Sequence, residues 1–236
     1  MAIVHDTTMS PGKLDLLAAW LPAQPWYSGN GREPQLAKAG GFRLDDPQGE
    51  IGIEFMLVAD GPVVYQVPMT YHGRELAGAD GRLIGTSEHG VLGHRWIYDG
   101  IRDPVLVTQL VALIQGDVEA QAQGVSSTPD PTVTGQPVAA DSLAAISSVV
   151  SGDGPAGTEL LVDTVGPDGR ASGQLTLRIR RILQEDASGA PPGDAGQAGD
   201  ETDLPCLSGL WRRPDGAEVR GVLATARWAP LPLAQP

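Results

Sequence analysis

The stretch from Ile51 to Tyr71 reads IGIEFMLVADGPVVYQVPMTY, and it decides the fold of the N-terminal half. Apolar and β-branched residues fill 51–58 and 63–71, which is typical of two strands. Between them, residues 59–62 (ADGP) favour a tight reversal of the chain. The stretch therefore predicts an antiparallel hairpin. Because Pro68 has no N–H to donate, we expect the second strand to lie at a sheet edge or to end near that residue.

Working outward from this hairpin, the sequence predicts two more strands and a helix on its C-terminal side. The strands are expected at 83–86 and 92–98, where apolar residues again lie between turn residues. The helix is expected at 103–115, with Asp103 as its N-cap. This helix is apolar almost all round, so we expect it to be docked against the sheet.

On the N-terminal side of the hairpin, the sequence predicts a short amphipathic helix at 11–21. Ser10 is expected to be its N-cap and Pro11 its first residue, a position where the missing N–H costs nothing. Pro22 is expected to end the helix, because proline cannot continue it.

The second half of the chain is rich in glycine and proline and is predicted to be β-structure. Two hairpins are expected at 158–183 and 207–226, each around a Pro-Asp-Gly turn. Residues 124–140 are interpreted as a linker, and 185–203, which hold no large apolar residue, as a disordered loop. The hairpins belong to a small β-rich region at 141–230.

We therefore predict an α+β fold. The first domain, residues 1–123, is expected to be an antiparallel meander flanked by helices, and the hairpin-rich unit follows it.

Charge and cysteine content exclude several classes of function. The 236 residues include 29 acidic and 16 basic side chains, a formal net charge of −13. Such a surface repels phosphate backbones, so no nucleic-acid partner is expected. The single cysteine, Cys206, excludes an intrachain disulfide and a Cys-based zinc site. Residues 1–6 lack the pattern of a leader, and no apolar run reaches membrane-spanning length, so we expect a cytoplasmic protein with no membrane partner.

Titratable residues offer no clear catalytic pattern. His89 and His94 are five residues apart, which would place them on opposite faces of one strand and matches no zinc motif. We interpret them as structural or surface histidines. The acid pairs Asp45-Asp46 and Asp99 with Asp103 are interpreted as turn formers or caps rather than general acids. No catalytic residue, metal ligand or cofactor is predicted.

The aromatic residues leave two interpretations open. In the first, Trp20, Trp26, Tyr27, Trp96 and Tyr98 form the core between the first helix and the sheet. Alternatively, Trp26 and Tyr27, with Asn30 and Arg32 close by, form a platform on which a sugar ring stacks.

The run AWLPAQPWYSG at 19–29 resembles the W-L-x-x-Q-R-W-Y-x-G opening of actinobacterial maltokinases and related glucosamine kinases. In that family the motif begins an N-terminal cap domain. Residues 65–68 (YQVP), residues 98–100 (YDG) and the apolar helix after them follow the order of the cap, so the resemblance covers about 10–120. Pro25 replaces the arginine of the motif, so any contact made by that arginine is lost. Residues with a motif or structural role are Trp20, Leu21, Gln24, Trp26, Tyr27, Trp96 and Tyr98.

The residues that such a kinase would need for phosphoryl transfer have no counterparts in this sequence. No histidine is followed two residues later by aspartate, as the catalytic loop of the family requires. The only lysines, Lys13 and Lys38, lie in the cap-like half. The residues after 123 are too few for two kinase lobes.

The resemblance therefore implies a non-catalytic accessory or regulatory module in α-glucan, trehalose or maltose-1-phosphate metabolism. It would act by contacts with a glucan or with a partner such as a kinase or a glucan- or trehalose-metabolising enzyme. One alternative is a divergent sugar kinase or glucan-acting enzyme that uses ATP. Another is a structural partner subunit. The enzyme alternative needs an ATP site built from Arg178, Arg180 and Arg181 with Asp163 or Asp168.

Overall fold

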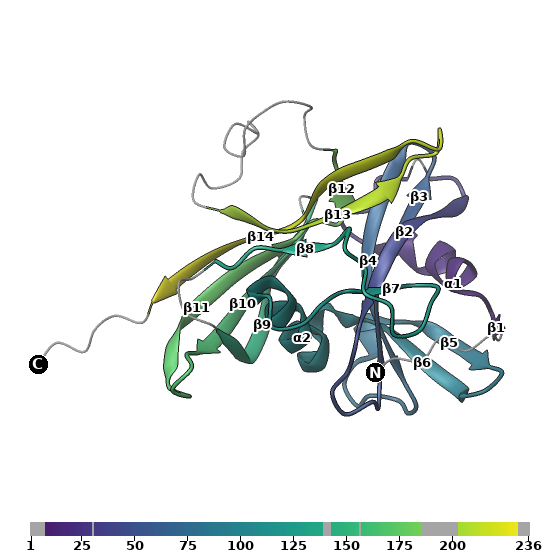
Figure 1. The fold of residues 1–236 in the computed structure, drawn as a ribbon. Coiled ribbons are helices and arrows are strands. Elements are labelled where there is room, and N and C mark those ends of the chain that lie inside the picture. Colours follow the sequence, from purple (N-terminus) through teal and green to yellow (C-terminus); the bar gives the residue numbers. More distant parts are fainter. Residues whose placement is uncertain (1–7, 30, 139–142, 156, 186–202, 231–236) are drawn as a thin grey trace, which may run out of the picture.

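The computed structural model describes residues 8–29, 31–138, 143–155, 157–185 and 203–230, which form two antiparallel sheets with two α-helices (Figure 1). The first sheet has the strand order β1-β5-β6-β4-β3-β2-β7, and β12 pairs with β4 beside this path. Its strands are β1 (Met9–Ser10), β2 (Leu36–Leu44), β3 (Gly52–Asp60), β4 (Val63–His72), β5 (Leu83–His89), β6 (Gly93–Asp99), β7 (Gln121–Ala122) and β12 (Ile182–Leu183).

The second sheet has the order β8-β13-β14-β11-β10-β9. Its strands are β8 (Thr134–Gly135), β9 (Ala144–Gly154), β10 (Gly157–Val165), β11 (Ala171–Ile179), β13 (Leu204–Arg212) and β14 (Glu218–Pro230). The helices are α1 (Lys13–Trp20) and α2 (Pro104–Gln115), and three short 3-10 turns are η1 (Leu21–Ala23), η2 (Asp80–Arg82) and η3 (Gly100–Arg102). Strands thus dominate the described residues, so the α+β prediction fits only coarsely and the flanking helices are a minor part.

The hairpin predicted at 51–71 is confirmed as β3 and β4, paired from Asp60 and Val63 at the turn. Of the two alternatives predicted for Pro68, the sheet edge is wrong, because β4 lies between β6 and β3, whereas the strand does end soon after Pro68, at His72. Pro68 pairs with β3 on one side. On its other side β4 changes neighbours, from β12 opposite Tyr65 to β6 from Met69 onward. The missing N–H therefore falls at a gap between two partner strands.

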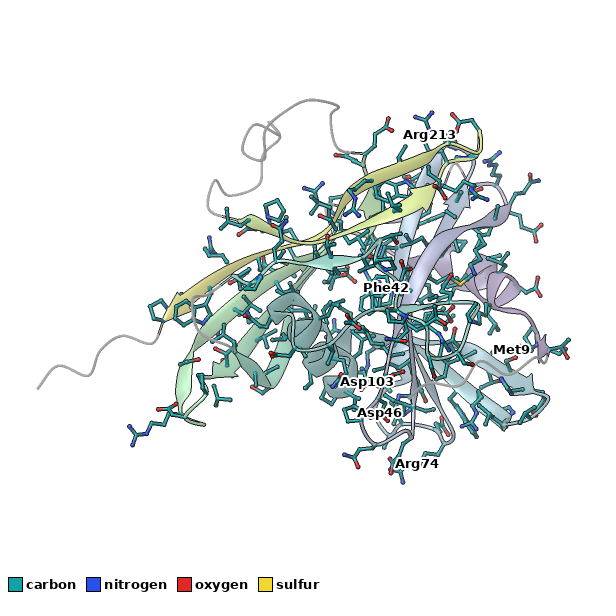
Figure 2. The ribbon with its side chains drawn as sticks, in the orientation of Figure 1. Met9, Phe42, Asp46, Arg74, Asp103 and Arg213 are labelled. Atoms are coloured by element: carbon teal, nitrogen blue, oxygen red, sulfur yellow. The ribbon has the colours of Figure 1, made fainter. Side chains whose placement is uncertain are left out.

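The central strands β3 and β4 are buried on both faces, which explains why β3 is apolar almost without interruption. Side chains alternate along a strand. Phe55 and Leu57 accordingly belong to the hydrophobic cluster shared with α2 and the second sheet, and Met56 and Val58 belong to the cluster under α1. Phe42 of β2 stacks on Phe55 at 4.5 Å between ring centroids and lies near the centre of the molecule (Figure 2).

Both predicted helices form, but the first begins later than expected. Gly12 is the N-cap of α1, and its backbone N–H donates to the carboxylate of Asp15 at 3.1 Å. The prediction that Ser10 caps the helix is therefore wrong, and Ser10 pairs instead with Glu88 of β5. The cap of α2 is confirmed, because the Asp103 carboxylate accepts the N–H of the second helical residue at 3.0 Å.

The two hairpins of the second half are confirmed as β10–β11 and β13–β14. In both turns a glycine adopts a positive φ, 73° at Gly169 and 87° at Gly216, as the Pro-Asp-Gly sequences predict. Strand β8, within residues 124–140, pairs with β13. Most of the predicted loop at 185–203, namely 186–202, lies outside the described residues.

The second sheet packs on one face only. In β10 the buried residues Thr158, Leu160, Val162 and Thr164 alternate with more exposed ones. The buried face contacts α2 and the first sheet, since leucines of β10 and β11 belong to the same hydrophobic cluster as Phe42. In Figure 1, α2 lies between the two sheets.

No helix among the described residues has both the length and the apolar character needed to cross a membrane.

Candidate functional site

A buried arginine, Arg181, joins the two sheets, and it contacts Trp26 and Asp99 in the part of the chain that resembles the maltokinase cap. Arg181 lies in the short link from β11 to β12, and its side chain is 0% exposed. Its Nη2 donates to Asp99 Oδ2 at 2.6 Å, and its Nε donates to Thr158 Oγ1 at 2.8 Å. The guanidinium lies 5.0 Å from the ring centre of Trp26, within the range of a cation–π contact.

Gln66, at the centre of β4, holds the same link by its backbone and its side chain. Its backbone N–H donates to the Arg181 carbonyl at 2.9 Å. Its side-chain amide donates to the carbonyls of Arg180 and Leu223, both at 3.1 Å. Since Gln66 is 0% exposed, these bonds are made without competition from solvent. Gln66 and the link from β11 to β12 therefore have a structural role, because they hold the two sheets together.

The structure brings together only some of the residues predicted to contact a sugar. Trp26 is 1% exposed and packs against Trp20 and Tyr65, so it presents no open ring face. Tyr27 and Arg32 meet at the buried carboxylate of Asp60, with distances of 2.6 Å from Tyr27 Oη and 3.4 Å from Arg32 Nη2. Asn30 lies outside the described residues.

Asp60 also changes the acidity of its partner. Burial, followed by the hydrogen bond to Asp60, raises the pKa of Tyr27 to about 12. Tyr27 therefore stays a hydrogen-bond donor at neutral pH, and its hydroxyl is committed to Asp60.

A groove of about 440 Å³ lies beside these residues, between α1 and residues 31–34. Its floor is apolar, formed by Ala18, Ala19 and Pro22, and its polar groups come from Asp15, Arg32 and Glu33. Of the four residues predicted to bind a sugar, Arg32 alone lines this groove among those described.

The remaining motif residues have structural surroundings. Leu21 is 0% exposed, and the amide of Gln24 donates to the Trp20 carbonyl at 3.1 Å. Trp96 packs edge-on against His94, and Tyr98 is 2% exposed.

The prediction that His89 and His94 occupy opposite faces of one strand is wrong, because they lie on two strands of a hairpin. His89 ends β5, and His94 lies near the start of β6. His94 is paired with Glu88 across the hairpin, and His89 Nδ1 accepts from the backbone amides of the turn. No group of three or more His, Cys, Asp and Glu side chains that could hold a metal ion occurs among the described residues.

The arginines and acids of the enzyme alternative are not gathered into one site. Arg181 is buried against Asp99, whereas Arg178 pairs with Glu159 and Asp203 on the second sheet. Asp163 accepts hydrogen bonds from neighbouring strands, and Asp168 lies in the turn after β10.

Sequence reasoning missed the pairing of His72 with Asp103. The two side chains approach to 2.7 Å between Nε2 and Oδ2, and both are largely buried. Burial raises the pKa of Asp103, but hydrogen bonds from His72 and from the Val105 amide outweigh it and hold this pKa below its usual value. The residues are 31 apart in the chain, so no local pattern could have indicated the contact. A pocket of about 430 Å³ opens above the pair.

Comparison with known families gives one finding about residues 20–103, which match the model of the maltokinase N-terminal cap domain. No curated protein matches the chain. The matched segment contains Trp26, Gln66 and Asp99, whereas Arg181 lies outside it. Residues 20–103 thus match the maltokinase N-terminal cap domain, and the resemblance predicted from the sequence is confirmed for this segment.

Proposed function

We propose that this protein is a non-catalytic, cap-like accessory module of cytoplasmic α-glucan, trehalose or maltose-1-phosphate metabolism. The module acts by contacts with a glucan or with an enzyme of that metabolism. The observation that carries the proposal is the cap-domain match at 20–103, whose residues Trp26 and Asp99 are occupied in holding Arg181. Since the motif residues serve as scaffold, the contacts with partners fall to the surfaces around them.

The groove beside α1 is the surface whose chemistry suits a glucan. An apolar floor of alanine and proline side chains can contact the C–H face of a sugar ring, and carboxylate and guanidinium groups can bind its hydroxyls. Glu33 and Asp15, in the first turn of α1, are both exposed, so their carboxylates remain accessible. The contact with Trp26 that the sequence suggested is replaced in this proposal by the groove next to it.

Affinity electrophoresis in gels that contain glycogen or amylopectin tests the glucan contact. We expect retardation of the protein, and we expect Ala19→Trp to abolish it because the indole fills the groove. Ala217→Trp, in an exposed turn of the second sheet, is the matched control and should migrate like the parent protein.

Capture from a native lysate tests the protein contact. The proposal fails if the protein shows no retardation in any glucan gel and also recovers no sugar-metabolising enzyme. Equal retardation of the Ala19→Trp variant and the parent would exclude the groove as the glucan site.

A further inference from the structure

The second pocket of the first sheet gathers three arginines. It lies where β4 ends and α2 begins, and Arg74, Arg82 and Arg102 line it from three separate segments of the chain. Figure 2 shows Arg74 and Asp103 at the same end of the molecule. The pocket is about 430 Å³ in volume, within the range of sites that hold small molecules.

The described structure gives these three arginines no acidic partner, although the chain has 29 acidic side chains against 16 basic ones. Other arginines do pair with acids, among them Arg178, Arg181, Arg212 and Arg213. Within the described part of the chain, none of the three pocket arginines forms an ion pair or a side-chain hydrogen bond.

A further guanidinium lies directly behind the pocket. A Cβ placed on Gly73, which lines the pocket, would come within 2.7 Å of Arg95 Nη1, so the Arg95 side chain packs against this backbone. Arg95 Nη2 is held by the Leu92 carbonyl at 2.7 Å, a neutral partner that leaves its charge uncompensated. Positive charge is therefore concentrated at one site of an otherwise acidic molecule.

The two acids that line the pocket, Asp103 and Glu50, offset only part of the charge of the arginines. The Asp103 oxygens are bonded to His72 and to the first turn of α2, so they are not paired with an arginine. Glu50 is exposed at the rim. The N-terminus of α2 is already capped by Asp103, so the arginines are the groups that can bind an anion.

The geometry points to a site for the phosphate group of a small phosphorylated organic molecule, and we propose this as a second binding function of the first sheet. Guanidinium groups offer paired donors that match the oxygens of a phosphate, and three of them suit a dianion better than a single carboxylate. Ile51, Leu76 and Val105 add an apolar wall, which would contact the carbon skeleton of the ligand. The site shares no residue with the glucan groove, so the two proposals stand or fall separately.

Isothermal titration calorimetry at low ionic strength tests the proposal on the whole chain, with inorganic phosphate, glucose 6-phosphate and glucose as probes. We expect glucose 6-phosphate to bind more tightly than inorganic phosphate, because it reaches the apolar wall, and glucose not to bind. Added salt should weaken both phosphate probes, since the rim is exposed.

Arginine variants locate the site. Arg102→Gln and Arg74→Gln should each weaken binding of glucose 6-phosphate by about tenfold or more, as expected for a lost charge-assisted bond. Both side chains are exposed, so folding should be unaffected, which circular dichroism can verify. Arg170→Gln, at an arginine that is 88% exposed in a turn of the second sheet, is the matched control and should leave the affinity unchanged.

Three results would overturn the inference. The first is no heat with either phosphate probe. The second is equal affinity for inorganic phosphate and glucose 6-phosphate, which would show that the apolar wall does not contact the carbon skeleton of the ligand. The third is the same loss of affinity in the Arg170 control as in the pocket variants, which would show general charge attraction only.

Discussion

Replacement of Arg181 by methionine should cost this protein a large part of its stability. Methionine fills a similar apolar volume but cannot donate to Asp99 or Thr158, which Arg181 contacts at 2.6 and 2.8 Å. Bonds to a charged group contribute about 1.5–3 kcal/mol each, and the contact with Trp26 adds about 0.5–2 kcal/mol. Loss of one partner from a buried pair, which leaves Asp99 unpaired, is expected to cost about 3–5 kcal/mol.

Equilibrium unfolding in guanidinium chloride, followed by tryptophan fluorescence and far-UV circular dichroism, measures this loss. The two signals must coincide before a free energy of unfolding is derived. Arg212→Met is the control, because the Arg212–Glu218 pair is 63% exposed on both sides and should contribute no more than about 1 kcal/mol. If Arg181→Met does not fold, Arg181→Lys keeps the charge and should lose less.

A double-mutant cycle separates the pair from the rest of the effect. Asp99→Asn keeps the oxygen that accepts the Ile101 N–H but removes the charge. Combined with Arg181→Met, it should cost less than the sum of the two single changes, with a coupling of about 0.5–3 kcal/mol. A loss of stability in Arg181→Met no larger than in the Arg212 control, or a coupling of zero, would show that the buried pair does not stabilise the fold.

Three further predictions follow from single sites. Because the pKa of Asp103 is lowered in the folded protein, its ionised form stabilises the fold at pH values above the usual carboxyl pKa, and this stability is lost as the pH falls through the folded-state pKa. His72→Phe should therefore move the midpoint of acid unfolding, followed by fluorescence, to higher pH, and an unchanged midpoint would contradict the pairing. Burial raises the pKa of the Cys206 thiol, so Ellman's reagent should react with it only in denaturant, and reaction of the native protein would disprove the burial. Gly157 has a φ of 138°, and a Cβ there would collide with a β11 carbonyl, so Gly157→Ala should lower the free energy of unfolding by about 1–3 kcal/mol in thermal unfolding. Gly152→Ala, whose Cβ would meet nothing within 4 Å, is the control, and equal melting temperatures of the two variants would show that β10 adapts.

Local patterns in the sequence predicted the elements that depend on neighbours in the chain. The hairpin at 51–71 follows from two apolar runs and a turn, and the hairpins of the second half follow from their Pro-Asp-Gly turns. The α2 cap follows from Asp103 and the proline after it. Each of these signals is contained within a few residues, and so it can be read without knowledge of the fold.

Strand β2 was missed because its local sequence argues against a strand. It reads LAKAGGFRL, and Gly40 and Gly41 interrupt the apolar pattern. Both glycines have positive φ values, and the register with β3 shifts between Lys38 and Gly40. A Cβ on Gly41 would collide with the Phe55 carbonyl, so the glycines permit a close approach to β3. Pairing with the neighbouring strand, not local preference, makes this segment a strand.

The sequence by itself determined the strands and helices with strong local signals, the acidic charge and the cap motif at 19–29. The tertiary structure decided what surrounds Trp26 of the motif, because Arg181 reaches Asp99 across 82 residues and covers the Trp26 ring. It also decided that Arg74, Arg82 and Arg102 line one pocket. The physical reason is that turns and periodicity act between near neighbours, whereas charge pairing and pocket formation depend on which distant segments the packed sheets bring together.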